Sequence, residues 1–344
     1  MTHTAPLTIV PATAVAAGPP PERSSSRHRT TGIVLAVVSA LAFSSSGPLV
    51  KPLLEAGWSL SSALVVRMGL AGLILSPALV RAVTRERSFL RRHGLALLAF
   101  GLIPIAGCQL LFFSAMQTMP VAVALLIQYL APVFLVGYVW VRTRRAPSRL
   151  VIVGSLVAIT GLVLVVDVSG ARFDLVGTLL ALGAAVCVCV YFVMSEGTGA
   201  DLPPLALASG GLLVGALAMA AVGGIGVIPF AAPDVTVVFR GVEVAGWLPI
   251  LWVGAVGTTL GYALGVVAVP RIGARLASFV GLSEVLFALL FSWLLLAETP
   301  APIQFIGGAL ILVGVVLVRM DAEAAAEVTN PVEPLPAEGA LDSR

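Results

Sequence analysis

The chain contains two related segments, and this repetition limits the folds that it can adopt. Residues 94–165 align without a gap to residues 247–318, at a constant shift of 247 − 94 = 153 positions. The less common residues fall in register: Trp140 with Trp293, Pro147 with Pro300, Gly154 with Gly307, and Gly161 with Gly314. Because Trp, Pro and spaced Gly do not match by chance over such a length, the sequence predicts two similar halves.

The composition indicates that these halves lie in a membrane. Hydrophobic residues make up 59% of the chain, charged residues make up 11%, and the mean hydropathy is +1.06, values outside the range of soluble domains. A helix needs about 20 apolar residues to cross a bilayer. Runs of that kind occupy 32–54, 60–80, 94–116, 120–141, 150–167, 175–195, 205–225, 247–268, 274–296 and 301–319. We therefore expect an all-α integral membrane protein with ten transmembrane helices, five in each half.

The ends of the chain differ from the apolar body. Residues 1–30 contain clustered Pro, Ser and Arg, and residues 320–344 contain Ala, Pro and several acidic residues. Such segments lack the apolar residues of a packed core, so both are predicted to be disordered tails. Between them we expect one five-helix repeat over 31–168 and a second over 175–319.

The distribution of Arg predicts the orientation of the helices. Arg clusters before the first helix and in the loops after the second, fourth and eighth helices, and such residues favour the cytoplasmic side. The pattern predicts that both termini are cytoplasmic, in a bacterial-type plasma membrane. A five-helix unit ends on the side opposite to its start, so the second copy enters upside down. Inverted repeats of this kind are typical of secondary transporters with alternating access.

The second copy also carries a recognisable pattern. The stretch 277–314 has Glu284 within a helix, the sequence Leu-Leu-Leu-Ala-Glu-Thr-Pro over 294–300, and then Gln304. It resembles the EamA repeat of the drug/metabolite transporter superfamily, and the first copy is similar through 115–132 and 154–161. The resemblance covers roughly 32–319. It implies a bundle of ten helices in two inverted halves, and export of amino acids, related metabolites or drugs, often against a proton gradient.

Two charged residues lie within the predicted spans. Glu284 is near the middle of the span 274–296, and Arg67 lies in the second span. A charge at this depth costs several kcal/mol unless it is paired or hydrated. We predict that Glu284 binds a proton or a substrate amine and that Arg67 binds a substrate carboxylate. The alternatives are an ion pair between the two, present only in the empty cavity or permanently, and an Arg67 side chain that reaches toward the headgroups.

Further polar residues in the spans are candidate substrate ligands. Gln109 aligns with Tyr262 under the repeat shift, so the two are expected to line opposite walls of one cavity. Gln128 and Tyr129 lie in the fourth span, although hydrogen bonding between helices and, for Tyr129, core packing are alternative roles. Ser45 belongs to a Ser-Ser-Ser-Gly-Pro sequence that is predicted to kink the first helix, because Pro48 cannot donate to a backbone carbonyl.

Several functional classes are not supported by the sequence. Its three His lie in the N-terminal tail or a basic loop, and the motifs of zinc proteases, serine hydrolases and ATP-driven pumps are missing. We therefore expect no enzymatic activity, no metal, no cofactor and no nucleic-acid partner. The Gly rows in the spans 150–167 and 301–319 predict close helix packing, within the chain or in a homodimer.

Three functions remain open. A proton-coupled exporter of amino acids or related metabolites is the leading interpretation, since Arg67 and Glu284 suit the two charges of a zwitterion. A carrier or flippase of lipids or hydrophobic drugs is the alternative, for which we expect a polar groove open to lipid. A membrane enzyme or assembly factor is expected to gather polar residues at the membrane surface.

Overall fold

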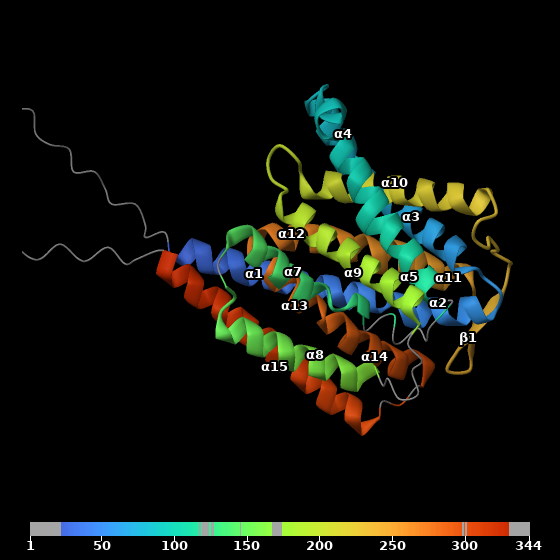
Figure 1. The fold of residues 1–344 in the computed structure, drawn as a ribbon. Coiled ribbons are helices and arrows are strands. Elements are labelled where there is room, and N and C mark those ends of the chain that lie inside the picture. The colour runs from blue at the N-terminus through green and yellow to red at the C-terminus, as the bar shows by residue number, and fades with distance from the viewer. Residues whose placement is uncertain are drawn as a thin grey trace, which may run out of the picture.

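The chain forms a bundle of helices with one short hairpin (Figure 1). The computed structural model describes residues 22–329, except 117, 119–123, 125–126, 145, 167–173, 298 and 300. Its helices are α1 (Glu22–Ser44), α2 (Ser46–Glu55), α3 (Leu60–Arg85), α4 (Phe89–Phe100), α5 (Cys108–Met116), α7 (Ala131–Thr143), α8 (Arg149–Val166), α9 (Leu175–Glu196), α10 (Pro204–Gly224), α11 (Trp247–Trp252), α12 (Thr259–Ile272), α13 (Ala274–Gly281), α14 (Ser283–Leu296) and α15 (Pro302–Thr329). Two π-helical segments, η1 (Gly101–Gly107) and η2 (Val253–Thr258), connect α4 to α5 and α11 to α12.

The helices have the length and composition of a multi-pass membrane protein. In the described part of the chain, 7 helical stretches are long and apolar enough to cross a bilayer. They are His28–Glu55, Leu60–Arg85, Phe89–Phe112, Leu175–Glu196, Pro204–Gly224, Trp247–Ile272 and Ala274–Leu296. Three shorter apolar helices, at Ala131–Thr143, Arg149–Leu164 and Pro302–Val318, coincide with predicted spans. The expectation of a mostly helical membrane protein is therefore confirmed.

The predicted tails lie largely outside the described residues, which exclude 1–21 and 330–344. Where the structure does describe them, the chain is helical: α1 begins at Glu22, and α15 continues to Thr329. The extension of α15 has a local cause, because residues 322–327 are all Ala or Glu, which are strong helix formers.

Several helices are interrupted near their middle. The first span breaks at Ser45, between α1 and α2, and the Oγ atoms of Ser44 and Ser45 donate to the carbonyls of Leu41 and Ala42 at 2.7 Å each. The predicted kink is thus present, because Pro48 leaves a carbonyl of the preceding turn without its usual donor. Pro104 lies within η1, where the wider turn of a π-helix accommodates the missing amide.

Local geometry recurs at the shift of 153 residues. Helix α7 ends at Thr143 and α14 ends at Leu296, the aligned position. The residue after each helix has a left-handed backbone, with φ of 57° at Arg144 and 60° at Ala297. The next helices, α8 and α15, begin at the aligned residues Arg149 and Pro302. The two copies therefore share helix ends and turn conformations as well as sequence.

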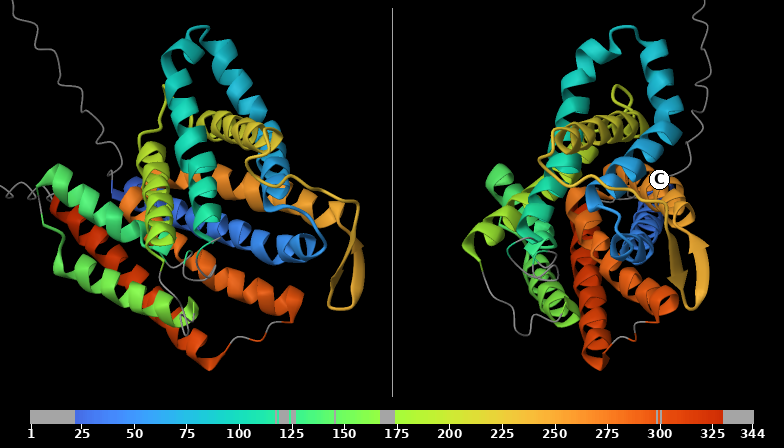
Figure 2. Two further views of the ribbon diagram at one scale, coloured as in Figure 1. Left: turned by 45° about the vertical axis from the view of Figure 1, so that its right-hand side comes forward. Right: turned by 90° about the vertical axis from the view of Figure 1, so that its right-hand side faces the viewer.

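Helices α8 and α15 lie side by side along one flank of the bundle (Figures 1 and 2). A Cβ atom added to Gly161 would lie 2.5 Å from the carbonyl oxygen of Gly307, and one added to Gly154 would lie 3.0 Å from that of Gly314. The earlier glycine of α8, Gly154, faces the later glycine of α15, Gly314, and Gly161 faces Gly307, so the two helices are antiparallel. The Gly rows thus form a close contact within one chain.

A β-hairpin occupies part of the segment between α10 and α11, for which the sequence predicted no regular structure. Strands β1 (Thr236–Phe239) and β2 (Val242–Ala245) pair antiparallel through a two-residue turn. Both turn residues have positive φ, 49° at Arg240 and 82° at Gly241, as in turns that match the twist of a hairpin. The Arg240 side chain donates to the carbonyls of Trp293 and Leu294, 2.5 Å away in each case, at the end of α14.

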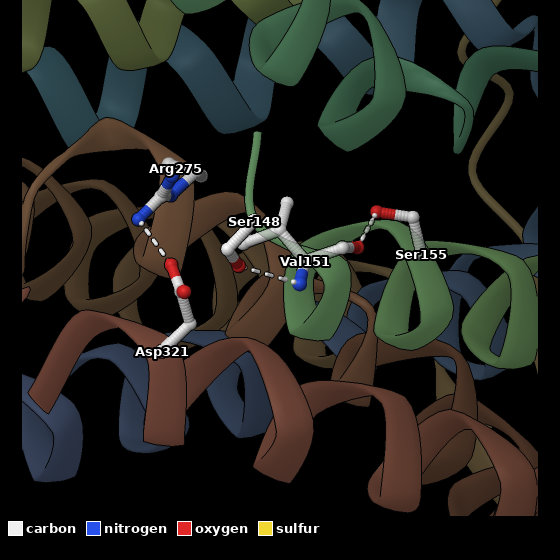
Figure 3. Close-up of polar contacts among 5 residues, drawn as sticks. All are labelled: Ser148, Val151, Ser155, Arg275 and Asp321. Atoms are coloured by element: carbon white, nitrogen blue, oxygen red, sulfur yellow. Dashed lines mark hydrogen bonds and ion pairs between the residues drawn. The ribbon is translucent and has the colours of Figure 1, made fainter. Parts of the chain in front are cut away.

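Figure 3 shows polar contacts at the start of α8 and an ion pair between α13 and α15. The Oγ atom of Ser148 accepts the amide hydrogen of Val151 at 3.2 Å and so caps the start of α8. Arg275 in α13 pairs with Asp321 in α15 at 3.1 Å, and both side chains are largely covered. This ion pair connects the helix before Glu284 to the last helix of the bundle.

Candidate functional site

A cavity of about 210 Å³ lies among the helices. Its walls come from α1, α3, η1, α5, α9, α12, α13 and α14 and from the residues just before α7. Its lining residues are Ala36, Ser39, Ala40, Phe43, Arg67, Pro104, Cys108, Gln109, Gln128, Val188, Tyr191, Phe192, Tyr262, Gly265, Ala268, Val269, Ala277, Gly281 and Glu284. Both sequence halves therefore contribute to one hollow.

Five of the seven residues predicted as substrate ligands line this cavity: Arg67, Gln109, Gln128, Tyr262 and Glu284. They come from five different helical segments, three in the first half of the chain and two in the second. Gln109 and Tyr262, which align under the repeat shift, both belong to the lining. The cavity thus collects an acidic and a basic side chain with three neutral polar side chains that the sequence had selected.

Arg67 is held in the cavity wall by the packing of α3. Its neighbours Leu64 and Met68 are 2% and 0% exposed, which fixes this part of the helix in the core. The Nε atom of Arg67 is buried and has no hydrogen-bond partner among the described residues. An unpaired buried donor lowers the stability of a protein by about 1–3 kcal/mol, and an acceptor atom that reached Nε from the cavity would satisfy this donor.

Glu284 lies in the first turn of α14, directly after the interruption at Leu282. The break resembles a reverse turn: the Leu282 amide donates to Phe279, and the Ser283 hydroxyl donates to Val280. In the first copy, α7 begins at Ala131, the residue aligned with Glu284, so that copy has the helix start without the carboxylate.

Arg67 and Glu284 do not form an ion pair in this structure. The ion pairs within 4.0 Å in the described part of the chain join other residues. A permanent contact pair, one of the alternatives from the sequence, is not what this structure contains. Both charges instead face the same space, and they are the charged residues of its described lining.

The remaining wall is formed by aromatic rings and hydroxyl groups that the sequence analysis did not select. The Tyr262 ring contacts the rings of Phe43 and Tyr191 edge to face, with centroids 5.0 and 5.9 Å apart. Ser39 donates to the Gly261 carbonyl at 2.6 Å. Tyr191 lies four residues after Cys187 in an apolar helix, and nothing in its spacing distinguishes it from a core residue.

Gly265 controls how closely two of these hydroxyls approach α12. A Cβ atom at this position would lie 2.6 Å from the Tyr191 Oη atom and 3.0 Å from the Ser39 Oγ atom. Contacts of this kind are too short for carbon and oxygen, so the hydroxyl positions depend on the missing side chain. Nothing in the residues around Gly265 distinguishes it from the other helical glycines.

Two predicted ligands lie elsewhere. Ser45 is buried, its hydroxyl donates back to Ala42 at 2.7 Å, and it borders a separate apolar hollow near Phe239 and Phe291. Tyr129 packs against the cluster of Phe279 and Leu282. Neither residue lines the cavity, because the helix break turns Ser45 toward its own backbone and the Tyr129 ring fills the core.

The cysteines take part in packing and orientation. Gln128 directs its amide nitrogen to the Cys108 Sγ atom at 3.2 Å, and that thiol lies 3.7 Å from the Ala184 carbonyl. The Cys189 thiol lies 3.1 Å from the Ala131 carbonyl. The described residues contain no group of three or more His, Cys, Asp or Glu side chains placed to hold a metal.

The chain is similar to known membrane proteins over most of its length. It is 28% identical to the threonine/homoserine exporter RhtA of Escherichia coli K12 over 231 residues, 65% of this chain and 70% of that protein. It is 26% identical to the uncharacterized inner membrane transporter YicL of Salmonella typhimurium LT2, over 85% of this chain and 96% of that protein. A crystal structure with 22% identity covers 88% of this chain with a TM-score of 0.66, which shows a shared fold.

The family model of EamA-like transporters matches the chain twice, at residues 30–167 and 175–320. These two matches include all five of the predicted ligands that line the cavity. The chain therefore belongs to the EamA-like transporter family, within the drug/metabolite transporter superfamily.

Proposed function

We propose that this protein is a proton-coupled exporter of small amino acids or related metabolites that works by alternating access. The observation that carries the proposal is the single cavity in which Arg67 and Glu284 face the same space without pairing. Membership of a transporter family and similarity to threonine/homoserine exporters support export of a small metabolite.

The arrangement of charges suits a zwitterion. The Arg67 guanidinium is a donor of the kind that binds carboxylates, and its buried Nε atom has no partner among the described residues. The Glu284 carboxylate accepts hydrogen bonds from an ammonium group. Gln109, Gln128 and Tyr262 add neutral donors and acceptors for a polar side chain of the substrate.

The size of the cavity also favours a small substrate. Pockets that hold drug-sized ligands have volumes of roughly 300–1,000 Å³, whereas this cavity has about 210 Å³. Its polar residues converge between helices of both halves. We therefore rank a carrier of lipids or hydrophobic drugs second.

The proposed coupling group is Glu284. It is the one carboxylate of the described cavity lining, and its counterpart in the first copy, Ala131, cannot bind a proton. When Glu284 releases its proton, its carboxylate can bind the substrate ammonium, so the carboxylate holds either the proton or the substrate. This alternation links the proton flux to the substrate flux. The positive charge of Arg67 balances the negative charge of Glu284 whenever the carboxylate is ionised.

The transport cycle that we propose uses ten spans in two inverted halves, with both termini in the cytoplasm. Antiparallel packing of α8 with α15 supports inversion, because these helices are the fifth of each half. The recurrence of helix ends at the shift of 153 residues supports a common plan for the halves. The breaks at Ser45 and Leu282 and the two π-helical segments interrupt four of the spans, as in other transporters whose broken helices form the substrate site.

Flux measurements test the proposal. The purified protein is reconstituted into vesicles preloaded with labelled threonine, homoserine or other small amino acids, and efflux is measured with and without an imposed pH gradient. We expect gradient-driven flux in the parent and none in Glu284→Gln. A matched control is Glu243→Gln, which removes a carboxylate in the exposed hairpin.

Either of two results would contradict the proposal. If the parent transports no amino acid but does transport hydrophobic drugs or lipids, the second-ranked function is correct. If Glu284→Gln, folded and inserted, responds to the pH gradient as the parent does, coupling through Glu284 is wrong.

A further inference from the structure

A second cavity has a separate set of lining residues, from α3, α4, α10, α12 and the segment before α10; Figure 1 shows the arrangement of these helices. Its volume is about 450 Å³, and three Arg side chains line it: Arg81 and Arg85 at the end of α3, and Arg271 at the end of α12. The sequence predicts that this end of the helices faces the cytoplasm. We propose that this cavity is a binding site for a phosphate-bearing anion, and the proposed transport function does not depend on it.

The charge of the cavity is positive despite two acidic residues in its lining. Those residues, Glu86 and Asp201, already have a cationic partner, because Arg92 lies 4.0 Å from the first and 3.5 Å from the second. Glu86 also accepts a hydrogen bond from the Ser88 hydroxyl at 2.7 Å. The two carboxylates share the one cation Arg92, so the four arginines and two carboxylates together keep a net charge of 4 − 2 = +2.

The three arginines retain free donors. Arg271 uses its Nη1 atom to donate to the Val267 carbonyl, which holds the side chain in place and leaves most of its five N–H groups for a ligand. No ion pair within the described part of the chain engages Arg81 or Arg85. A planar guanidinium matches the oxygen atoms of phosphate and binds them through paired hydrogen bonds.

The backbone adds to this attraction. Pro203 and Pro204 line the cavity, and α10, a helix of 21 residues, begins at Pro204. The positive end of the α10 dipole therefore lies beside the cavity, although Pro203 and Pro204 offer no backbone N–H to a ligand. Phe89, Leu205 and Val267 provide an apolar floor, so the site combines anionic and apolar recognition.

The chemistry fits two sources of phosphate. One is the headgroup of an anionic phospholipid, since basic pockets between helices at the cytoplasmic surface bind such headgroups. The other is a soluble phosphate or phosphate ester. Both sources use the same arginines, and the apolar floor and the position at the predicted membrane surface favour the lipid.

Binding measurements on the full-length protein test the site. The protein in neutral detergent is titrated with short-chain phosphatidylglycerol, with phosphatidylcholine of the same chain length, and with inorganic phosphate, and bound ligand is counted by native mass spectrometry. The variants are Arg85→Gln and Arg271→Gln. The control is Arg87→Gln, which removes the same charge from an exposed position in the same loop but outside the cavity lining.

We expect phosphatidylglycerol to bind more tightly than phosphatidylcholine, and each cavity variant to weaken it about fivefold, the effect of one Arg near an anionic surface. Arg85→Lys should restore part of the affinity. Competition by inorganic phosphate would identify a soluble anion as the ligand, and its failure to compete would identify the lipid headgroup. Both results support an anion site.

The proposal is overturned if the parent binds neither phosphate nor phosphatidylglycerol above phosphatidylcholine. It is also overturned if Arg85→Gln and Arg271→Gln bind phosphatidylglycerol as Arg87→Gln does. Size-exclusion chromatography of each variant shows that it remains folded, so a weakened affinity reports on the site itself.

Discussion

The contact between α8 and α15 gives a quantitative prediction for Gly161→Ala. The new Cβ atom would lie 2.5 Å from the Gly307 carbonyl oxygen, 2.7 Å from the Ile311 amide nitrogen and 2.9 Å from the Leu310 Cβ atom. Two of these atoms belong to a helix backbone, so no side-chain rotation relieves the overlap. Because non-bonded atoms prefer about 3.5–4.0 Å, the two helices must separate by about 1 Å.

The expected cost follows from two opposing effects. Overpacking of a close contact costs about 1–3 kcal/mol, whereas replacing Gly by Ala inside a helix contributes up to about 1 kcal/mol of helix propensity. Gly137→Ala in α7 is the matched control, since a Cβ atom there has no neighbour within 4 Å. Gly161→Ala should therefore unfold with a free energy about 1–3 kcal/mol lower than Gly137→Ala.

Thermal unfolding in detergent, followed by loss of the monodisperse peak, measures this difference. The repeat adds a further test, because Gly314 aligns with Gly161 and a Cβ atom there would lie 2.6 Å from the Gly154 carbonyl oxygen. Gly314→Ala should be destabilised to a similar degree. If Gly161→Ala and Gly137→Ala unfold together, the close backbone contact does not exist in the membrane protein and the packing argument is refuted.

Two further predictions concern the cavity wall and the hairpin. Gly265→Ala should lower the rate of amino-acid flux roughly tenfold, which corresponds to about 1.4 kcal/mol. The reason is that the new Cβ atom displaces the hydroxyls of Tyr191 and Ser39. Normal flux would show that these hydroxyls have no role in transport. Arg240→Asn places a residue that tolerates the left-handed turn but removes both hydrogen bonds to the end of α14. The unfolding free energy should therefore fall by about 1 kcal/mol, and Arg240→Lys should be intermediate. An unchanged unfolding temperature would disprove this stabilising role.

The sequence was most informative about features that depend on spacing. The lengths of the apolar runs gave the helices, and the shift of 153 residues anticipated the shared ends at Thr143 and Leu296. Glu284 and Arg67 could be selected because a charge in an apolar span needs an explanation. Their meeting in one cavity needed only the assumption that polar groups in the spans converge.

Other features depend on side-chain direction, which spacing does not supply. Tyr129 and Tyr191 occur in similar apolar contexts, yet only Tyr191 lines the cavity. Ser45 was selected for its position beside Pro48, but the helix break turns its hydroxyl to Ala42. The hairpin had a weak signal, because runs of Val flank Arg240 and Gly241, but its short strands do not stand out beside helices of 20 residues.

Binding selectivity tests most directly the claim that Arg67 and Glu284 together hold a zwitterion. Equilibrium binding of a labelled amino acid is measured in competition with its primary amine and its carboxylic acid, in the parent, Arg67→Gln and Glu284→Gln. We predict that the parent prefers the zwitterion to both analogues, that Arg67→Gln no longer distinguishes amino acid from amine, and that Glu284→Gln no longer distinguishes amino acid from carboxylic acid. Equal competition by all three ligands in the parent, or the same selectivity in all three proteins, would contradict the account.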